Sequence, residues 1–135
     1  MKVNIINNGD YFIENFDNVE VTDIAKLDDN CCFELHCDTH ILKLVKNKSF
    51  SDFIRLLVSK LRRGGMVCIS GVDMCSVTMS YVYKDINEEK LSELLSNSAG
   101  FYNCKMVEQE LIANNLRIDS MNIKNNIFVV RAVRD

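Results

Sequence analysis

The clearest feature in the pattern of apolar and polar positions is a helical stripe between residues 49 and 63. Its apolar side chains recur at spacings of three and four residues, at Phe50, Phe53, Ile54, Leu57, Val58 and Leu61. Such spacing places them on one face of a helix. Ser49 or Ser51 can cap the start of this helix, and Gly64 with Gly65 is expected to end it.

Segments typical of strands lie on both sides of this helix. Residues 66–70 are mostly apolar, and residues 31–38 alternate, with Cys31, Phe33, Leu35 and Cys37 on one face and Cys32, Glu34, His36 and Asp38 on the other. The order strand, helix, Gly-Gly turn, strand is one crossover unit of a parallel α/β sheet.

The N-terminal part predicts a strand, a turn and a second strand. Residues 2–6 are apolar and β-prone and stop at Asn7, Asn8 and Gly9, which tolerate the positive φ of a sharp turn. Alternation then predicts a second strand that runs to Asp23. A crossover helix with its loops needs at least about 10–12 residues, so the connection between these strands is a single helical turn or a tight loop.

The C-terminal part is less regular at its start than at its end. Residues 72–83 are apolar but lack a clean period, so they are a loop, an extra strand or a surface that meets a partner. Asn87 can cap a helix that ends near Gly100, and a last helix is expected over 105–114. Residues 116–123 and 127–133 predict a hairpin around Lys124, Asn125 and Asn126.

Length, composition and charge limit the kinds of protein that this chain can be. A chain of 135 residues with 47% apolar and 26% charged residues is expected to form one domain, residues 1–135. Its formal net charge of -3 gives no strong nucleic-acid signal. No apolar run is long enough for a membrane helix, and the N-terminus lacks an apolar signal core, so we expect a soluble cytoplasmic protein.

The six cysteines predict reduced structural thiols in such a compartment. Cys32, His36, Cys37 and His40 crowd one segment, which raises the alternative of a metal site. A zinc site usually has a second ligand pair further along the chain, and strand alternation sends His36 and Cys37 to opposite faces. We therefore predict no metal.

Three motifs in the expected order resemble class I methyltransferases that use S-adenosylmethionine. Residues 27–42 follow the spacing of the family motif L-P-F-x-D-N-S-F-D-x-V-x-x-x-H-V-L-E-H, and residues 61–65 match L-K-P-G-G. Residues 111–116 and the tail are similar to the closing L-L-x-x-A-G-F helix and hairpin, so the resemblance covers roughly 19–133. It implies an α/β, Rossmann-like fold with a mostly parallel sheet, helices on both faces and a C-terminal antiparallel hairpin, reduced at the N-terminal cofactor half.

The departures from the family lie in its cofactor-binding motif. The family has a D/E-x-G-x-G-x-G turn after its first strand, where bare backbone lets the cofactor approach. This chain has one glycine there, Gly9, and no preceding acid. Asp23 could take the cofactor's ribose hydroxyls, or it could align with the later acid that flanks the adenine.

The resemblance also implies a set of site residues. S-adenosylmethionine would be lined by Asn7, Asn8, Gly9 and Asp23, with Asp38 and Thr39 facing it from the fourth strand of the family fold. His40 would be the catalytic base for an unknown small-molecule or macromolecular acceptor. A histidine at a strand end is also commonly a loop or packing residue.

Two other functions stay open. A degenerate methyltransferase fold could serve as a catalytically inactive binding or assembly module, with residues 72–83 contacting a second copy or a partner chain; alternatively, those side chains simply cover the sheet. A nucleotide-binding domain of another class would need more glycine, or a Lys-Ser/Thr pair, after the first strand, and neither is present.

Overall fold

The computed structural model describes residues 1–135 and contains one six-stranded sheet in the order β2-β1-β3-β4-β6-β5. The strands are β1 (Lys2–Ile6), β2 (Asp17–Glu20), β3 (Cys32–Cys37), β4 (Leu61–Val72), β5 (Arg117–Lys124) and β6 (Ile127–Val133). The first four are parallel, and β6 runs antiparallel to both β4 and β5. The predicted crossover unit, mostly parallel sheet and antiparallel hairpin are confirmed.

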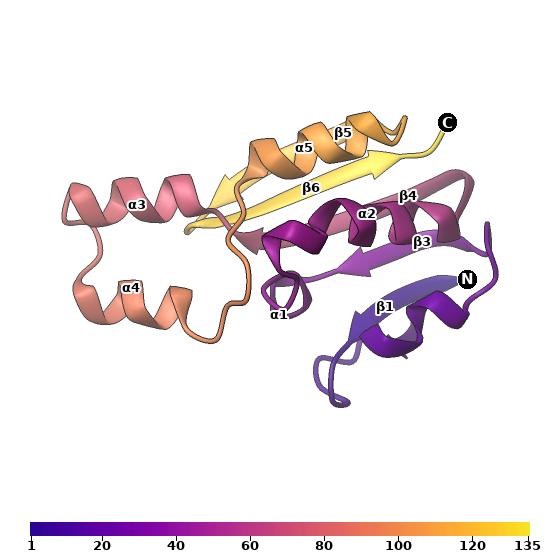
Figure 1. Cartoon of the computed structure of the whole chain (residues 1–135), viewed down its shortest axis with the longest axis horizontal. Helices are drawn as coiled ribbons and strands as arrows, with labels where there is room; N and C mark the ends of the chain where they lie inside the picture. The colour runs from indigo at the N-terminus through magenta and orange to yellow at the C-terminus, as the bar shows by residue number, and fades with distance from the viewer.

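The helices lie on one face of this sheet and beyond one of its ends (Figure 1). They are η1 (Val21–Lys26), α1 (Thr39–Leu42), η2 (Asn47–Ser49), α2 (Phe50–Lys60), α3 (Met74–Val82), α4 (Glu88–Leu95) and α5 (Cys104–Ala113). Buried side chains of η1, α1, α2 and α5 form one 22-residue core with alternate strand residues such as Leu35 and Val130. No helix in the protein is long and apolar enough to cross a membrane.

The opposite face of the sheet has no helical cover. Several of its side chains, among them His36, Ser70 and Arg131, are only partly buried or exposed, although Asn4 and Cys68 on the same face are buried.

The connection between β1 and β2 contains no helix, and only a loop covers this part of the face. The Phe16 ring packs edge-on against His36, with centroids 4.9 Å apart. The Tyr11 carbonyl oxygen accepts a hydrogen bond from the Asn4 side chain at 2.9 Å. The expectation of helices on both faces is therefore wrong.

The helical stripe is confirmed in α2, where Phe50, Ile54 and Leu57 are buried. The helix ends at Lys60, however, and not at the glycines, which lie inside the long strand β4. Gly64 has φ +77°, and a Cβ on Gly65 would lie 2.8 Å from the Arg62 carbonyl oxygen. The two glycines thus shape the start of a strand rather than the end of a helix.

Two other boundaries differ from the predictions. Residues 72–83 contain the helix α3, because the Asp73 side chain caps it by accepting a hydrogen bond from the Ser76 N–H at 2.8 Å. The second strand ends at Glu20, and the residues up to Asp23 already belong to η1.

The hairpin turn is confirmed. Asn125 and Asn126 both have positive φ, 53° and 65°, as a two-residue hairpin turn requires. The register between β5 and β6 shifts between Ile118 and Ser120, which marks a bulge in β5.

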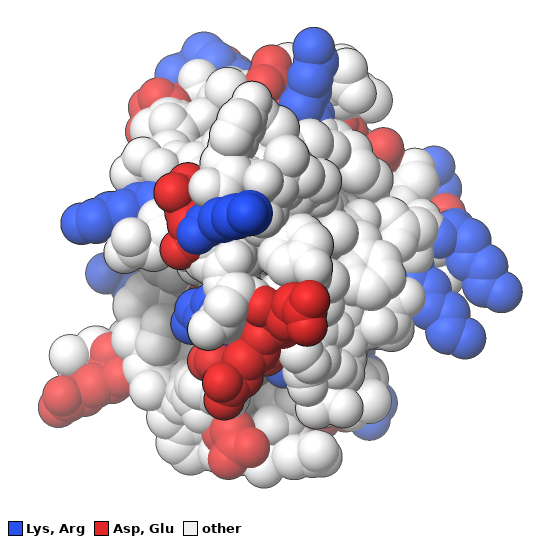
Figure 2. Space-filling model, turned by 90° about the vertical axis from the view of Figure 1, so that its left-hand side faces the viewer, with Lys and Arg blue, Asp and Glu red and all other residues white.

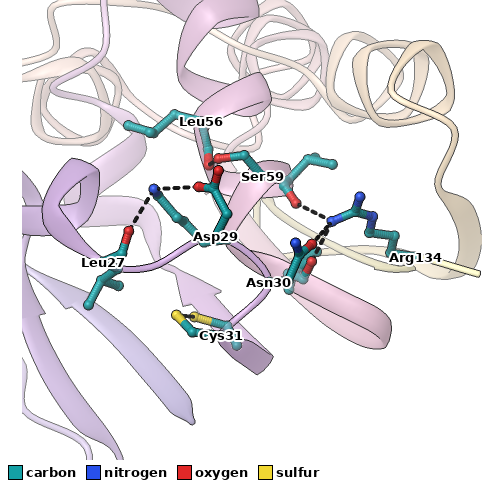
Figure 3. A network of polar contacts seen from close by, with 11 residues as sticks. Leu27, Asp29, Asn30, Cys31, Leu56, Ser59 and Arg134 are labelled. Atoms are coloured by element: carbon teal, nitrogen blue, oxygen red, sulfur yellow. Dashed lines mark hydrogen bonds and ion pairs between the residues drawn. The ribbon is translucent and has the colours of Figure 1, made fainter.

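The amino-terminal ends of the parallel strands are joined by a polar network (Figure 3). The Lys60 Nζ is buried and donates to the Leu27 carbonyl at 2.8 Å and to Asp29 Oδ1 at 2.9 Å. Arg134 donates to Asn30 Oδ1 at 2.8 Å and to the carbonyl oxygens of Val58 and Leu61. The network links the chain before β3, the end of α2 and the end of β6.

All six cysteines are free thiols. Cys32, Cys37 and Cys68 are buried, and desolvation raises the pKa of each. Thiols held protonated in this way are unreactive, which fits the prediction of structural roles for these three.

Candidate functional site at the carboxyl edge of the sheet

The turn after β1 presents two backbone donors to one carboxylate. Asn8 and Gly9 have φ of 55° and 73°, and their N–H groups donate to Glu20 Oε2 at 3.0 Å and Oε1 at 2.8 Å. Glu20 ends β2 and lies opposite Ile6, the last residue of β1. Asn7 forms an isolated antiparallel bridge with Asp10, which closes the turn.

Sequence reasoning missed Glu20. The alternation predicts that the second strand ends at Asp23, but Asp23 lies in η1, where it pairs with Lys26 at 2.9 Å. The signal that identifies Glu20 is the register of β2 against β1, because the strand stops where β1 stops. Glu20 is thus the acid at the end of the second strand.

The residues after β3 gather around a second part of the site. Asp38 Oδ1 accepts a hydrogen bond from the Thr39 N–H at 2.7 Å and caps α1, which carries His40. The Tyr11 ring stacks on the His40 ring with centroids 4.1 Å apart. Tyr11, Asp38, Thr39, His40 and Lys43 line an open hollow of about 310 Å³. The structure therefore brings the three predicted residues together and adds Tyr11.

His40 has an unsatisfied polar atom. Its Nε2 is buried and has no hydrogen-bond partner in the protein. Desolvation lowers the pKa of His40, although the negative charge of Asp38 and a hydrogen bond to the Ile5 backbone oppose this. Burial therefore favours the neutral ring, and its unpaired nitrogen reaches a bound molecule only if the residues that cover it move.

The fold is similar to that of solved methyltransferases. A SAM-dependent methyltransferase from Archaeoglobus fulgidus matches with a TM-score of 0.65 and 10% identity over 98% of this chain and 75% of that one. A possible exported protein from Bordetella parapertussis matches at 0.62 and 13% over 88% of this chain. An O-methyltransferase family protein from Burkholderia thailandensis matches at 0.61 and 8% over 89% of this chain.

The chain is short beside several of these proteins, since it spans 44% of the Bordetella chain and 36% of the Burkholderia chain. No protein-family model and no curated protein matches the sequence. At identities near 10% the likeness concerns architecture, and it agrees with the strand order and the motifs described above. The protein has a class I, S-adenosylmethionine-dependent methyltransferase-like fold.

Proposed function

We propose that the protein binds S-adenosylmethionine at the carboxyl edge of β1 and β3 and transfers its methyl group to an unidentified acceptor. One observation carries this proposal: Glu20, the acid at the end of β2, is held at hydrogen-bond distance from the turn after β1. Open α/β sheets bind ligands outside the carboxyl ends of their strands, and this is where the turn lies.

The residues at this edge fit such a ligand. A carboxylate offers about four lone-pair positions, and the two N–H groups of the turn use only two of those of Glu20. The remaining two can accept hydrogen bonds from ribose hydroxyls. The hollow beside Tyr11 supplies space, and the unpaired Nε2 of His40 supplies a further polar contact if the residues that cover it move.

The cofactor would supply a methyl group on a sulfonium, which an acceptor displaces directly. Binding that aligns the reactants then provides much of the catalysis, and no protein nucleophile is needed. Glu20 and the Asn8–Gly9 turn would hold the ligand, and Asp38 and Thr39 would border it. Because burial favours the neutral ring of His40, its Nε2, once uncovered, can accept the proton that a hydroxyl or amine acceptor loses.

A second candidate is a binding module that keeps the fold but not the reaction. The turn after β1 has a single glycine, and Glu20 already engages the N–H groups of both Asn8 and Gly9. The absence of a helix between β1 and β2 agrees with a cofactor half that has been reduced. In this second candidate Glu20 is a structural residue.

Calorimetric titration with S-adenosylmethionine and S-adenosylhomocysteine separates the two. The first proposal expects micromolar binding, and Glu20→Gln should weaken it about tenfold through the loss of a charged acceptor. Asp17→Asn is the matched control, because Asp17 is an exposed acid at the opposite end of the same strand β2, and it should leave affinity unchanged. If neither ligand binds at millimolar concentration, the enzyme proposal is wrong and the module is favoured.

A further inference from the structure

Helices α3 and α4 form an arm that extends beyond the carboxyl end of the sheet (Figure 1). Only Val77 is buried in α3, and α4 has no buried residue. Met79, Val82 and Tyr83 are 52%, 63% and 68% exposed, and Tyr81 is 38% exposed. Of the side chains interpreted as a cover for the sheet, Val77 is thus buried, but Met79, Tyr81 and Val82 are not. With Tyr83 these three form an apolar surface at the tip of the arm.

The base of the arm is firmly held. The buried Asp73 carboxylate accepts hydrogen bonds from the N–H groups of Ser76 and Cys104 at 2.8 and 2.7 Å. Asn126 Oδ1, from the β5–β6 turn, accepts from the hydroxyls of Ser76 and Ser80 at 2.8 and 3.0 Å. Because these hydrogen bonds hold α3 along most of its length, its exposed tip is a fixed surface and not an unwound helix end.

Acidic side chains flank the apolar tip. Asp85, Glu88 and Glu89 are exposed and form no ion pair, whereas Lys90 is paired with Glu93 at 3.5 Å. Lys84 is the only unpaired base nearby, which leaves a net negative tip. Figure 2 looks onto the arm side of the molecule and shows Asp and Glu side chains gathered in the lower middle of this face.

Apolar and acidic groups meet in one hollow at the tip. It has a volume of about 500 Å³ and is bordered by Tyr81, Val82, Lys84, Asn87 and Glu88. The Tyr81 hydroxyl donates to Glu88 Oε1 at 3.5 Å, so an aromatic ring and a carboxylate share one wall. A side chain that enters this hollow can contact apolar surface and a carboxylate at once.

We propose that the arm tip docks a partner segment that carries Lys or Arg beside bulky apolar side chains. Amphipathic segments of this kind bind apolar surfaces through spaced anchors, and charge complementarity selects their sign. A second copy of the chain is a poorer occupant, because it would bring two net negative tips together. The proposal does not depend on whether the carboxyl edge binds a cofactor.

The experiment uses a fluorescent peptide of Leu and Lys with an amphipathic helical pattern and a matched peptide of Leu and Glu. Fluorescence anisotropy with the full chain should show at least about tenfold tighter binding of the Leu/Lys peptide. Val82→Ser with Tyr83→Ser should weaken that binding about tenfold, as expected for the loss of central apolar contacts. Glu88→Lys with Glu89→Lys should weaken it by a similar factor and reduce its sensitivity to salt.

Matched controls test whether the tip itself is responsible. Met121→Ser with Ile123→Ser changes equally apolar exposed positions on β5, and Glu14→Lys with Asp17→Lys changes exposed acids elsewhere. Both controls should bind the Leu/Lys peptide as the unchanged protein does. Equal weakening by controls and arm variants would show unspecific attraction and overturn the proposal. A dimer in light scattering that is lost on Val82→Ser with Tyr83→Ser would also overturn it, in favour of a second copy.

Discussion

The two ends of the parallel strands are built differently. At the amino-terminal end, Lys60 and Arg134 each donate two or more hydrogen bonds to groups from distant parts of the chain. At the carboxyl end, His40 Nε2 has no partner and the ring stacked on it, Tyr11, is 66% exposed. One end has its polar groups paired within the protein, whereas the other leaves one buried ring nitrogen unpaired.

This difference suggests that one end of the parallel strands determines stability and the other end determines ligand binding. Buried polar groups that are fully paired hold elements in place, whereas an unpaired buried atom costs free energy unless a ligand satisfies it. We therefore expect substitutions at the amino-terminal end to lower the free energy of unfolding. Substitutions at the carboxyl end should mainly change ligand binding.

The largest effect on stability is expected for Lys60→Ala. This change leaves the Leu27 carbonyl without its donor and opens space beside the core, so it should cost about 2–3 kcal/mol of unfolding free energy. Urea denaturation measures the loss, and Lys48→Ala, on an exposed lysine of η2, should cost under about 0.5 kcal/mol. Equal losses would mean that the paired network does not stabilise this end.

A smaller loss is expected for Arg134→Ala. The guanidinium satisfies the carbonyl oxygens of Val58 and Leu61 at the end of α2, and its removal should cost about 1–2 kcal/mol. Thermal unfolding of this variant should be compared with that of Arg63→Ala, whose side chain is exposed. If the two variants melt at the same temperature, Arg134 does not stabilise the amino-terminal end of the strands.

Glu20→Gln tests the carboxyl end. A glutamine has one acceptor oxygen and can satisfy only one of the two N–H groups of the turn, so unfolding free energy should fall by about 1 kcal/mol. Any affinity for S-adenosylmethionine should nevertheless fall about tenfold. A stability loss as large as that of Lys60→Ala would show that Glu20 mainly stabilises the fold.

The smallest effect concerns the pH dependence through His40. Its pKa in the folded protein lies below the ordinary 6.5, so the folded state binds fewer protons than the unfolded chain as pH falls. The stability contribution is complete above about pH 6.5 and is lost as pH drops through the lowered pKa. Urea midpoints should therefore decrease less on acidification in His40→Gln than in the unchanged protein, and an identical decrease would contradict the assignment.

The parts of the fold that the sequence predicts are those with local, periodic signals. The apolar stripe of α2 and the Asn125–Asn126 turn each depend on residues close in the chain. The sequence does not predict helix α3, because its apolar residues follow no helical period. Its capping residue, Asp73, is fixed in part by the N–H of Cys104, thirty-one positions away.

The candidate site shows the same limit. Asp38, Thr39 and His40 are consecutive, so the motif alone keeps them together. Glu20 and Tyr11 reach the site through the register of β2 and a turn with a left-handed Tyr11, φ 65°. Neither is encoded in a short pattern. By contrast, the absence of a helix between β1 and β2 follows from the short length of that connection, which already limits it to a single helical turn or a tight loop.

The bulge in β5 has a consequence for behaviour at high concentration. β5 is an outer strand of eight residues with exposed Met121 and Ile123, whereas the other outer strand, β2, has only four residues. A long, regular, apolar outer strand is a template for edge-to-edge aggregation between chains. The register shift between Ile118 and Ser120 interrupts that template, and Arg117, Asp119 and Lys124 add charge along it. We therefore expect the bulge to disfavour edge-to-edge pairing between chains along β5.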